Sequence, residues 1–231
     1  MNPFDLRGPE FLLFYFFFSL IVILAITILR HRREAGPAPK IDLSDPYLIA
    51  YLRGGENEAL RLAVLSLVNR GILVMEGQFI RRADDSAGDT VKNLVEHETL
   101  KKFSAPDKAT SVFNDYNLKS ALQSYRQKLE DAGLLPDAAA SKARRLRFLI
   151  ALMALLIVGL IKINIGLSLG RPVFLLVFMM IAAVIIAAIC SFPRLTVRGK
   201  AALADIAHLY SGLRAQVNSF SPGGGPAEFA M

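Results

Sequence analysis

The chain has few of the residues from which metal and redox sites are built. Its 231 residues include one cysteine, Cys190, and three histidines. A single cysteine excludes an intramolecular disulfide and a cysteine metal site, so we expect a small packing role for it. The run Glu96-His97-Glu98 lacks the second histidine, four residues on, that a helical zinc site needs. We therefore predict no metal and interpret these three residues as charges on the surface of a helix.

The sequence also lacks the motifs of common enzyme classes. It has no P-loop, no dinucleotide-binding glycine pattern after a strand and no Gly-x-Ser-x-Gly turn. An enzyme or transporter component would need a paired set of polar residues within the apolar runs, but those present are isolated, and Lys162 can place its ammonium at a membrane interface. We therefore predict a non-enzymatic protein without a cofactor. The polar residues concerned are Ser19, Thr27, Lys162 and Asn164.

Apolar residues are abundant instead, at 53% of the chain. Three long runs, 11–29, 148–165 and 173–192, each have Arg or Lys crowded at one end. The first contains nineteen residues without a charge. As a helix it would rise about 28 Å, close to the roughly 30 Å hydrocarbon core of a bilayer. A cleaved signal peptide at 1–29 would have a shorter apolar core and a positive leading segment. We therefore predict three transmembrane helices.

The basic flanks predict how these helices are oriented. Lys and Arg near the end of a membrane helix favour the cytoplasmic side, and the clusters at 30–33, 142–147 and 194–200 agree on one orientation. Residues 1–10 and the loop 166–172 would lie outside, and the C-terminus would lie in the cytoplasm. We predict a multi-pass protein of the bacterial inner (plasma) membrane, with the lipid bilayer as its first partner.

The middle segment, residues 30–147, is predicted to be a small cytoplasmic domain. Asp45 followed by Pro46 is typical of a helix start, and Gly54-Gly55 is typical of a helix end. Residues 34–141 hold 13 Lys and Arg against 16 Asp and Glu, a net charge of −3. The overall charge of +7 therefore belongs to the membrane flanks, where it meets anionic lipid headgroups.

A second helix and a hairpin complete the first part of this domain. Asn57 can cap the second helix, and Gly71 can end it in the left-handed conformation. Residues 72–81, with a turn at 76–77, are typical of a small β-hairpin. The order helix, helix, hairpin predicts a winged-helix-like module. The predicted fold is mainly α: three transmembrane helices plus a small cytoplasmic helical domain with a winged-helix-like β-hairpin.

A weaker second copy of this pattern follows at an offset of 62 residues, where 129–135 resembles 67–73. Both have a helix, a glycine and two aliphatic residues, which is common enough that a chance match stays open. Between the copies we expect a helix at 91–103 and a break at 104–110.

The C-terminal part is predicted to be a cytoplasmic amphipathic helix at 193–220 and a disordered tail at 221–231, which is rich in Gly and Pro. Apolar residues of the helix recur at spacings of three and four and form a narrow seam. The seam would pack on the cytoplasmic domain or pair between subunits. Its residues are Leu203, Ile206, Tyr210, Leu213 and Val217.

Candidate binding residues follow from this plan. Arg53-Gly54-Gly55 could present backbone N–H groups to an anion, although a glycine turn between two helices is the simpler interpretation. A winged helix would use its second helix and wing on DNA, but a domain of net negative charge lacks the electrostatic attraction that dominates DNA affinity. We predict a scaffold or accessory subunit that binds a protein partner or forms a homo-oligomer; the alternative is a membrane-tethered DNA-binding transcription regulator. The candidate residues are Arg53, Gly54, Gly55, Arg61, Arg81, Arg82, Leu203, Ile206, Tyr210 and Leu213.

Three segments carry a resemblance to a known family. They are 45–55, which contains Ala50-Tyr-Leu-Arg-Gly-Gly55, then 67–73, and 195–200. Together they resemble a family of uncharacterised bacterial membrane proteins marked by an "AYLRGG" segment and a Gly-rich C-terminus. The resemblance covers most of the chain from residue 40 on and implies architecture, because no activity is established for that family. Some relatives end in long glycine runs with cysteines, and this chain does not.

Overall fold

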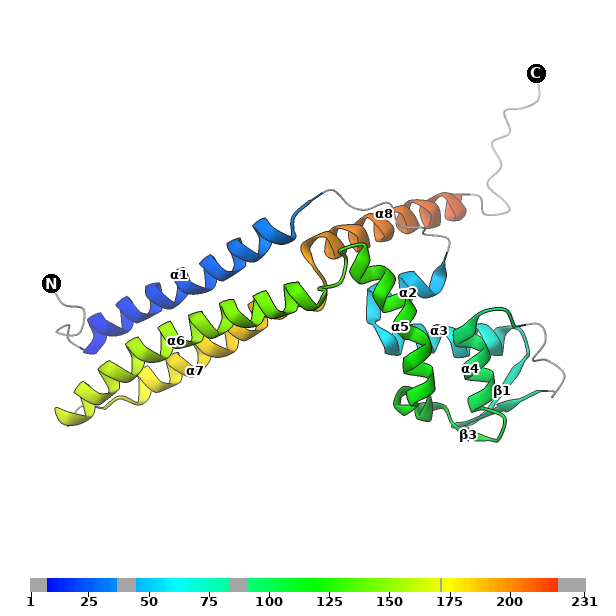
Figure 1. The fold of residues 1–231 in the computed structure, drawn as a ribbon, viewed down its shortest axis with the longest axis horizontal. Helices are drawn as coiled ribbons and strands as arrows, with labels where there is room; N and C mark the ends of the chain where they lie inside the picture. Colours follow the sequence, from blue (N-terminus) through cyan, green and yellow to red (C-terminus); the bar gives the residue numbers. More distant parts are fainter. Residues whose placement is uncertain (1–7, 37–44, 84–90, 171, 220–231) are drawn as a thin grey trace, which may run out of the picture. The chain divides into compact units, whose positions relative to one another are not determined.

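Two compact units make up the protein. The span unit contains Met1–Pro37 and Pro136–Val197, and the domain unit contains Ala38–Leu135 and Arg198–Met231. Figure 1 traces their elements along the chain. The computed structural model describes residues 8–36, 45–83, 91–170 and 172–219, with side chains described as far as Gly212.

The span unit consists of three long helices, α1 Gly8–Glu34, α6 Ala138–Ser168 and α7 Phe174–Ser191. Each is long and apolar enough to cross a membrane. The three predicted apolar helices are therefore confirmed, and they indicate a multi-pass membrane protein.

Helix α6 begins much earlier than the run predicted at 148–165. The Asp137 side chain accepts a hydrogen bond from the Ala140 N–H at 2.7 Å and so caps the helix at its start. The basic residues that follow are good helix formers, and nothing interrupts the helix before the apolar run. The domain limit expected at residue 147 thus lies inside a helix, and the two units divide at Pro136.

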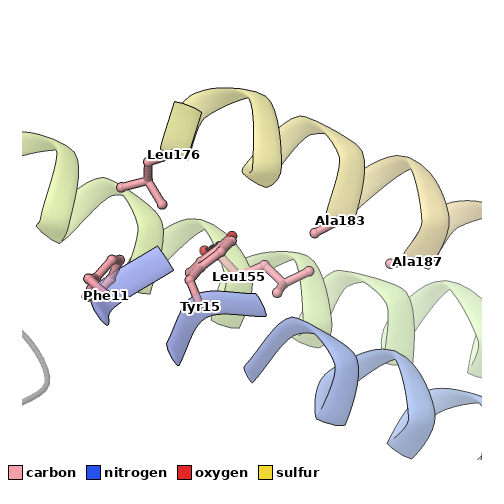
Figure 2. Packing of buried hydrophobic residues seen from close by; sticks show 6 residues of the cluster. All are labelled: Phe11, Tyr15, Leu155, Leu176, Ala183 and Ala187. Carbon is pink, nitrogen blue, oxygen red and sulfur yellow. Dashed lines mark hydrogen bonds between the residues drawn. The ribbon is translucent and has the colours of Figure 1, made fainter. Parts of the chain in front are cut away.

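The three helices of the span unit pack around a buried apolar cluster, shown in Figure 2. The Tyr15 hydroxyl of α1 donates to the Leu155 carbonyl of α6 at 3.1 Å. On α7 the buried residues Ala183 and Ala187 are small, which permits close helix contact. Around this cluster many large aliphatic and aromatic side chains stay exposed, as expected for helices surrounded by lipid. The cluster residues are Phe11, Tyr15, Leu155, Leu176, Ala183 and Ala187.

Arg144 joins the basic ends of the same helices. Its Nε and Nη2 atoms lie 2.8 and 2.7 Å from Glu34 Oε1, and its Nη1 donates to the Pro193 carbonyl at 2.7 Å. Nearby, Arg30 of α1 donates to the Cys190 carbonyl of α7 at 2.6 Å. Both members of the Arg144–Glu34 ion pair are buried, with 4% and 9% of their side chains exposed.

The domain unit arranges short helices around a three-stranded antiparallel sheet of order β1-β2-β3. The mainly helical fold with a small β-hairpin is thereby confirmed; its winged-helix character stays a prediction. The elements in chain order are α2 Pro46–Gly54, α3 Glu56–Asn69, β1 Leu73–Glu76, β2 Phe79–Arg82, α4 Leu94–Lys102, β3 Asp107–Lys108, the 3-10 helix η3 Ala109–Asn114, α5 Tyr116–Asp131 and α8 Val197–Ser219.

The start of α2 follows its sequence signals. Asp45 Oδ1 accepts a hydrogen bond from the Tyr47 N–H at 2.9 Å, and Pro46 is the first helical residue. The helix ends at Gly54, as predicted. These contacts are local, so the residues that make them are enough to predict them.

The prediction that Asn57 caps α3 is wrong. The helix begins at Glu56, and no side chain caps it. Gly55 takes its place with a φ of 78°, and its carbonyl accepts the N–H groups of Glu58 and Ala59 at 3.2 Å each. A residue with a side chain would be strained at this φ. The glycine therefore both ends α2 and begins α3.

The hairpin is present one residue later than predicted, as β1 and β2. The break expected at 104–110 is wrong in part, because it contains a third strand, β3, in which Lys108 pairs with Phe79 and Asp107 with Ile80. Helix α4 is also shorter than the helix expected at 91–103.

Helices α3 and α5 end in the same way, which is the feature that suggested a repeat. Gly71 and Gly133 have φ values of 70° and 69°. The residue after each glycine donates its N–H to the carbonyl of Leu67 or Leu129, at 3.0 and 2.9 Å. The two segments then diverge into a strand and a membrane helix. The repeat stays a prediction.

Helix α8 begins against the turn that follows α5. A Cβ atom on Gly199 would collide with the Leu134 carbonyl, so glycine permits this approach. Beyond it Ala202 and Ile206 are buried. Of the predicted seam, Ile206 is therefore buried, Leu203 is half-buried and Tyr210 is exposed. The side chains of Leu213 and Val217 and the tail 221–231 lie outside the described residues.

Candidate partner-binding site

An apolar groove opens along α3 in the domain unit. We call it the α3 groove; it encloses about 380 Å³. Helix α3 forms its floor, and β1 and η3 form its sides. Its residues are Leu60, Arg61, Val64, Leu65 and Val68 from α3, Met75 from β1, and Ala109, Thr110, Val112 and Phe113 from η3.

The groove exists because α3 is apolar on two sides. One face buries Ala59, Ala63 and Leu67 in the domain core. The opposite face carries Val64, Leu65 and Val68, and a helix with apolar residues on two faces needs a second contact surface. Leu65 is 55% exposed and Met75 51% exposed. The described part of the domain unit thus leaves one side of α3 uncovered.

The wall that faces α3 is held by β3. Residue Ala109, where η3 begins, donates its N–H to the Gln78 carbonyl at 2.9 Å. Lys102 Nζ lies 3.1 Å from Asp107 and 3.5 Å from Asp115, at the two ends of this segment. The position of η3 is therefore fixed by the pairing of β3 with β2 and by the ion pairs of Lys102. It does not depend on contacts across the groove.

Two of the predicted residues, Arg53 and Arg61, contact the same carboxylate beside the α3 groove. Glu58 contacts Arg53 closely and lies 3.4 Å from Arg61 Nη1, so one carboxylate serves both cations. The Arg61 guanidinium lies over the Phe113 ring, 5.6 Å from its centroid. Sequence analysis selected Arg61 but missed the apolar residues beside it. The sequence feature that could have revealed them is that α3 has more aliphatic residues than one core-facing side needs.

The Arg53-Gly54-Gly55 segment has the structure of a turn. The Gly55 N–H donates to the Tyr51 carbonyl at 2.8 Å, and the Arg53 side chain is directed to Glu58. A Cβ atom on Gly54 would collide with the Glu58 side chain. These contacts favour a glycine turn between two helices over an anion site.

The other predicted residues lie elsewhere. Arg81 pairs with Glu76 across the hairpin at 2.7 Å, and Arg82 Nε donates to the Leu100 carbonyl at 2.8 Å. Leu203, Ile206 and Tyr210 lie on α8, and the side chain of Leu213 is outside the described residues. Of these residues, those with described side chains do not line the α3 groove.

A buried carboxylate corrects another expectation. Glu96, interpreted as a surface charge, is only 6% exposed. The Tyr47 hydroxyl donates a short hydrogen bond to its Oε1, the Ser66 hydroxyl donates to the same atom at 2.8 Å, and Arg70 Nη1 lies 2.7 Å from its Oε2. Glu96 therefore joins α2, α3 and α4, and it does not line the α3 groove.

The titration of this cluster follows from its contacts. Burial alone would raise the pKa of Glu96, but the hydrogen bonds from Tyr47 and Ser66 and the charge of Arg70 outweigh it and lower the pKa. Burial, followed by the bond to Glu96, raises the pKa of Tyr47 well above its usual value. At neutral pH the pair is thus a phenol and a carboxylate, which suits a structural link.

Within the described ranges no group of three or more His, Cys, Asp or Glu side chains gathers to hold a metal ion. No family model matches the chain, and no curated protein or solved structure matches it either. The fold defines a helical protein with three candidate membrane spans and a small domain that carries an apolar groove. Membership of the family with the "AYLRGG" segment stays a prediction.

Proposed function

We propose that this protein is a non-enzymatic scaffold or accessory subunit of the bacterial inner membrane that binds a protein partner in the cytoplasm. The α3 groove carries the proposal. Exposed apolar side chains in a concave site are typical of protein recognition, because an inserted side chain is desolvated on several sides at once. We expect the partner to insert an aliphatic or aromatic side chain between Leu65, Met75 and Phe113.

The contacts of the predicted arginines in the domain unit support a protein over DNA. Arg53 and Arg61 share Glu58, and Arg81 is paired with Glu76. Each of these cations therefore has an acidic neighbour that repels phosphate. DNA affinity depends on Lys and Arg that neutralise phosphates, so the tethered regulator has less support.

The test compares two leucines of similar exposure in the domain unit. Leu65 is 55% exposed in the α3 groove, and Leu94 is 58% exposed at the start of α4 outside it. In Leu65→Glu, binding of the partner protein would bury a carboxylate that has no hydrogen bond or counter-charge, which is costly. We therefore expect at least tenfold less of the partner protein to co-purify with the full chain in mild detergent. Leu94→Glu should retain the wild-type amount, because exposed substitutions alter stability by only about 0.5 kcal/mol.

Equal recovery of the partner by both variants would refute the α3 groove as the binding site. Salt-sensitive DNA binding by the full chain, unchanged in Leu65→Glu, would favour the regulator instead. Calorimetric unfolding of both variants shows whether each is folded.

The proposed orientation has a test of its own. We place the domain unit and the C-terminus in the cytoplasm and the N-terminus outside, because Arg and Lys crowd one end of each membrane helix. Fluorescent-protein and alkaline phosphatase fusions after residue 85 should report the cytoplasm, and fusions after residue 168 should report the outside. The reverse pattern would overturn the orientation.

A further inference from the structure

The length of the α3 groove suits one kind of partner. Its floor follows α3 from Leu60 to Val68, and Val68 follows Leu60 by eight residues, which is about 12 Å along a helix. Two turns of a second helix rise about 11 Å, so a helix that lies along α3 would contact the groove over its full length. Such a helix contacts a groove with residues i, i+3, i+4 and i+7.

The backbone around the groove favours a helix over an extended peptide. The floor residues lie inside the helix Glu56–Asn69, where backbone N–H and C=O groups bond one another. On the facing wall, the Ala109 N–H donates to the Gln78 carbonyl at 2.9 Å. An extended peptide along α3 would bury its own N–H and C=O groups against apolar side chains, which is costly. A helix bonds these groups internally and avoids that cost.

Charge beside the groove favours an acidic partner. Among the described residues that line the groove, Arg61 is the only charged one. Its side chain is 67% exposed, and its guanidinium lies over the Phe113 ring. Its acidic neighbour Glu58 lies 3.4 Å away but contacts Arg53 more closely, so two guanidinium groups share one carboxylate. One net positive charge is little for DNA, which needs several phosphate contacts, but it is enough to pair with one carboxylate of a protein.

The proposed function places a partner protein in the α3 groove. Resting on that function, we propose that the partner inserts an acidic amphipathic helix. The apolar face of this helix lies between Leu65, Met75 and Phe113, and a carboxylate at the edge of that face contacts the Arg61 guanidinium. The apolar contacts supply most of the affinity, and the carboxylate fixes how the helix is placed along α3.

The experiment uses the full chain in phosphatidylcholine nanodiscs and three fluorescently labelled synthetic peptides. The acidic probe is a cross-linked helix with leucine at i, i+3, i+4 and i+7 and glutamate beside them. The basic probe has lysine in place of glutamate. The proline probe is the acidic peptide with two prolines inside it, which break the helix. Fluorescence anisotropy measures the binding of each probe.

We expect the wild type to bind the acidic probe at least fivefold more tightly than the basic probe and tenfold more tightly than the proline probe. Leu65→Gln removes an apolar contact without adding a charge and should weaken binding of the acidic probe at least tenfold. Arg61→Glu should prefer the basic probe. Lys101→Glu, the same change of charge at an exposed residue of α4 outside the groove, should keep the wild-type preference.

No binding of the acidic probe by the wild type, or unchanged binding in Leu65→Gln, would overturn the proposal. Equal binding of the acidic and basic probes, or a wild-type preference in Arg61→Glu, would refute the acidic character of the partner. Equal binding of the acidic and proline probes would refute its helical form. The proposed function is decided separately, because it fails only if Leu65→Glu retains the co-purified partner protein.

Discussion

The two units bury a carboxylate in different ways. In the span unit Glu34 faces Arg144, and both are buried, with 9% and 4% of their side chains exposed. In the domain unit Glu96 is buried, but its partner Arg70 is 41% exposed. Glu96 also accepts hydrogen bonds from Tyr47 and Ser66. Among the described side chains, Glu34 thus has one cation within ion-pair distance, Arg144, and Glu96 divides its charge among three donors.

The two carboxylates should differ in how well they remain solvated when their arginine is removed. A buried ion pair contributes little compared with apolar residues, but loss of one member leaves a charge that neither water nor a neighbour solvates. A carboxylate with several donors keeps most of its solvation. The Arg144–Glu34 pair should therefore be the more sensitive of the two, although both look alike in distance.

The largest effect is expected from Arg144→Ala. Removal of the guanidinium leaves Glu34 buried and frees the Pro193 carbonyl, so we expect a loss of about 3–5 kcal/mol. Hydrogen exchange of the full chain in detergent, read by mass spectrometry, should show faster exchange at the ends of α1 and α6. Peptides from α2, α3 and α4 should be unchanged.

Arg145→Ala is the matched control, since Arg145 is exposed beside Arg144. The double variant Glu34→Gln with Arg144→Met should recover most of the lost protection, because no charge then stays buried. If Arg144→Ala exchanged like Arg145→Ala, the ion pair would be irrelevant to the span unit.

A smaller effect is expected from Arg70→Ala. Glu96 keeps its bonds from Tyr47 and Ser66, so we expect a loss of about 1–2 kcal/mol, between the values for exposed and buried pairs. The same exchange experiment should show faster exchange in α3 and α4 only. A loss as large as that of Arg144→Ala would mean that the hydroxyl groups contribute nothing and would erase the contrast between the units.

The features that sequence analysis predicted correctly depend on neighbours in the chain. Asp45, Pro46 and Gly71 make their contacts with residues a few positions away, and the length of the three apolar runs is enough to predict membrane helices. Glu96 gave no such signal. Its partners Tyr47, Ser66 and Arg70 are 49, 30 and 26 residues away, so its burial depends on how α2, α3 and α4 pack.

The α3 groove was missed for a related reason. The sequence shows the apolar positions of α3. The aliphatic residues on its second face, however, would be predicted to lie in the core unless the position of η3 were known. The strand β3 that holds η3 has two residues, too short for an alternating pattern to reveal. Arg61 was predicted as a binding residue because of its charge. In the structure its guanidinium lies over the Phe113 ring at the edge of the α3 groove.

The smallest effect is a dependence on pH that ionised Glu96 should produce. Because the folded protein lowers its pKa below the ordinary value of 4.5, ionised Glu96 contributes stability that is fully present above that value. The contribution declines as pH falls through the lowered pKa. We expect the melting temperature of the domain unit, measured by calorimetry, to exceed that of Glu96→Gln by a constant amount from pH 8 to 6. The difference should shrink below about pH 4.5, and a difference that grew in acid would reverse the assigned charge state.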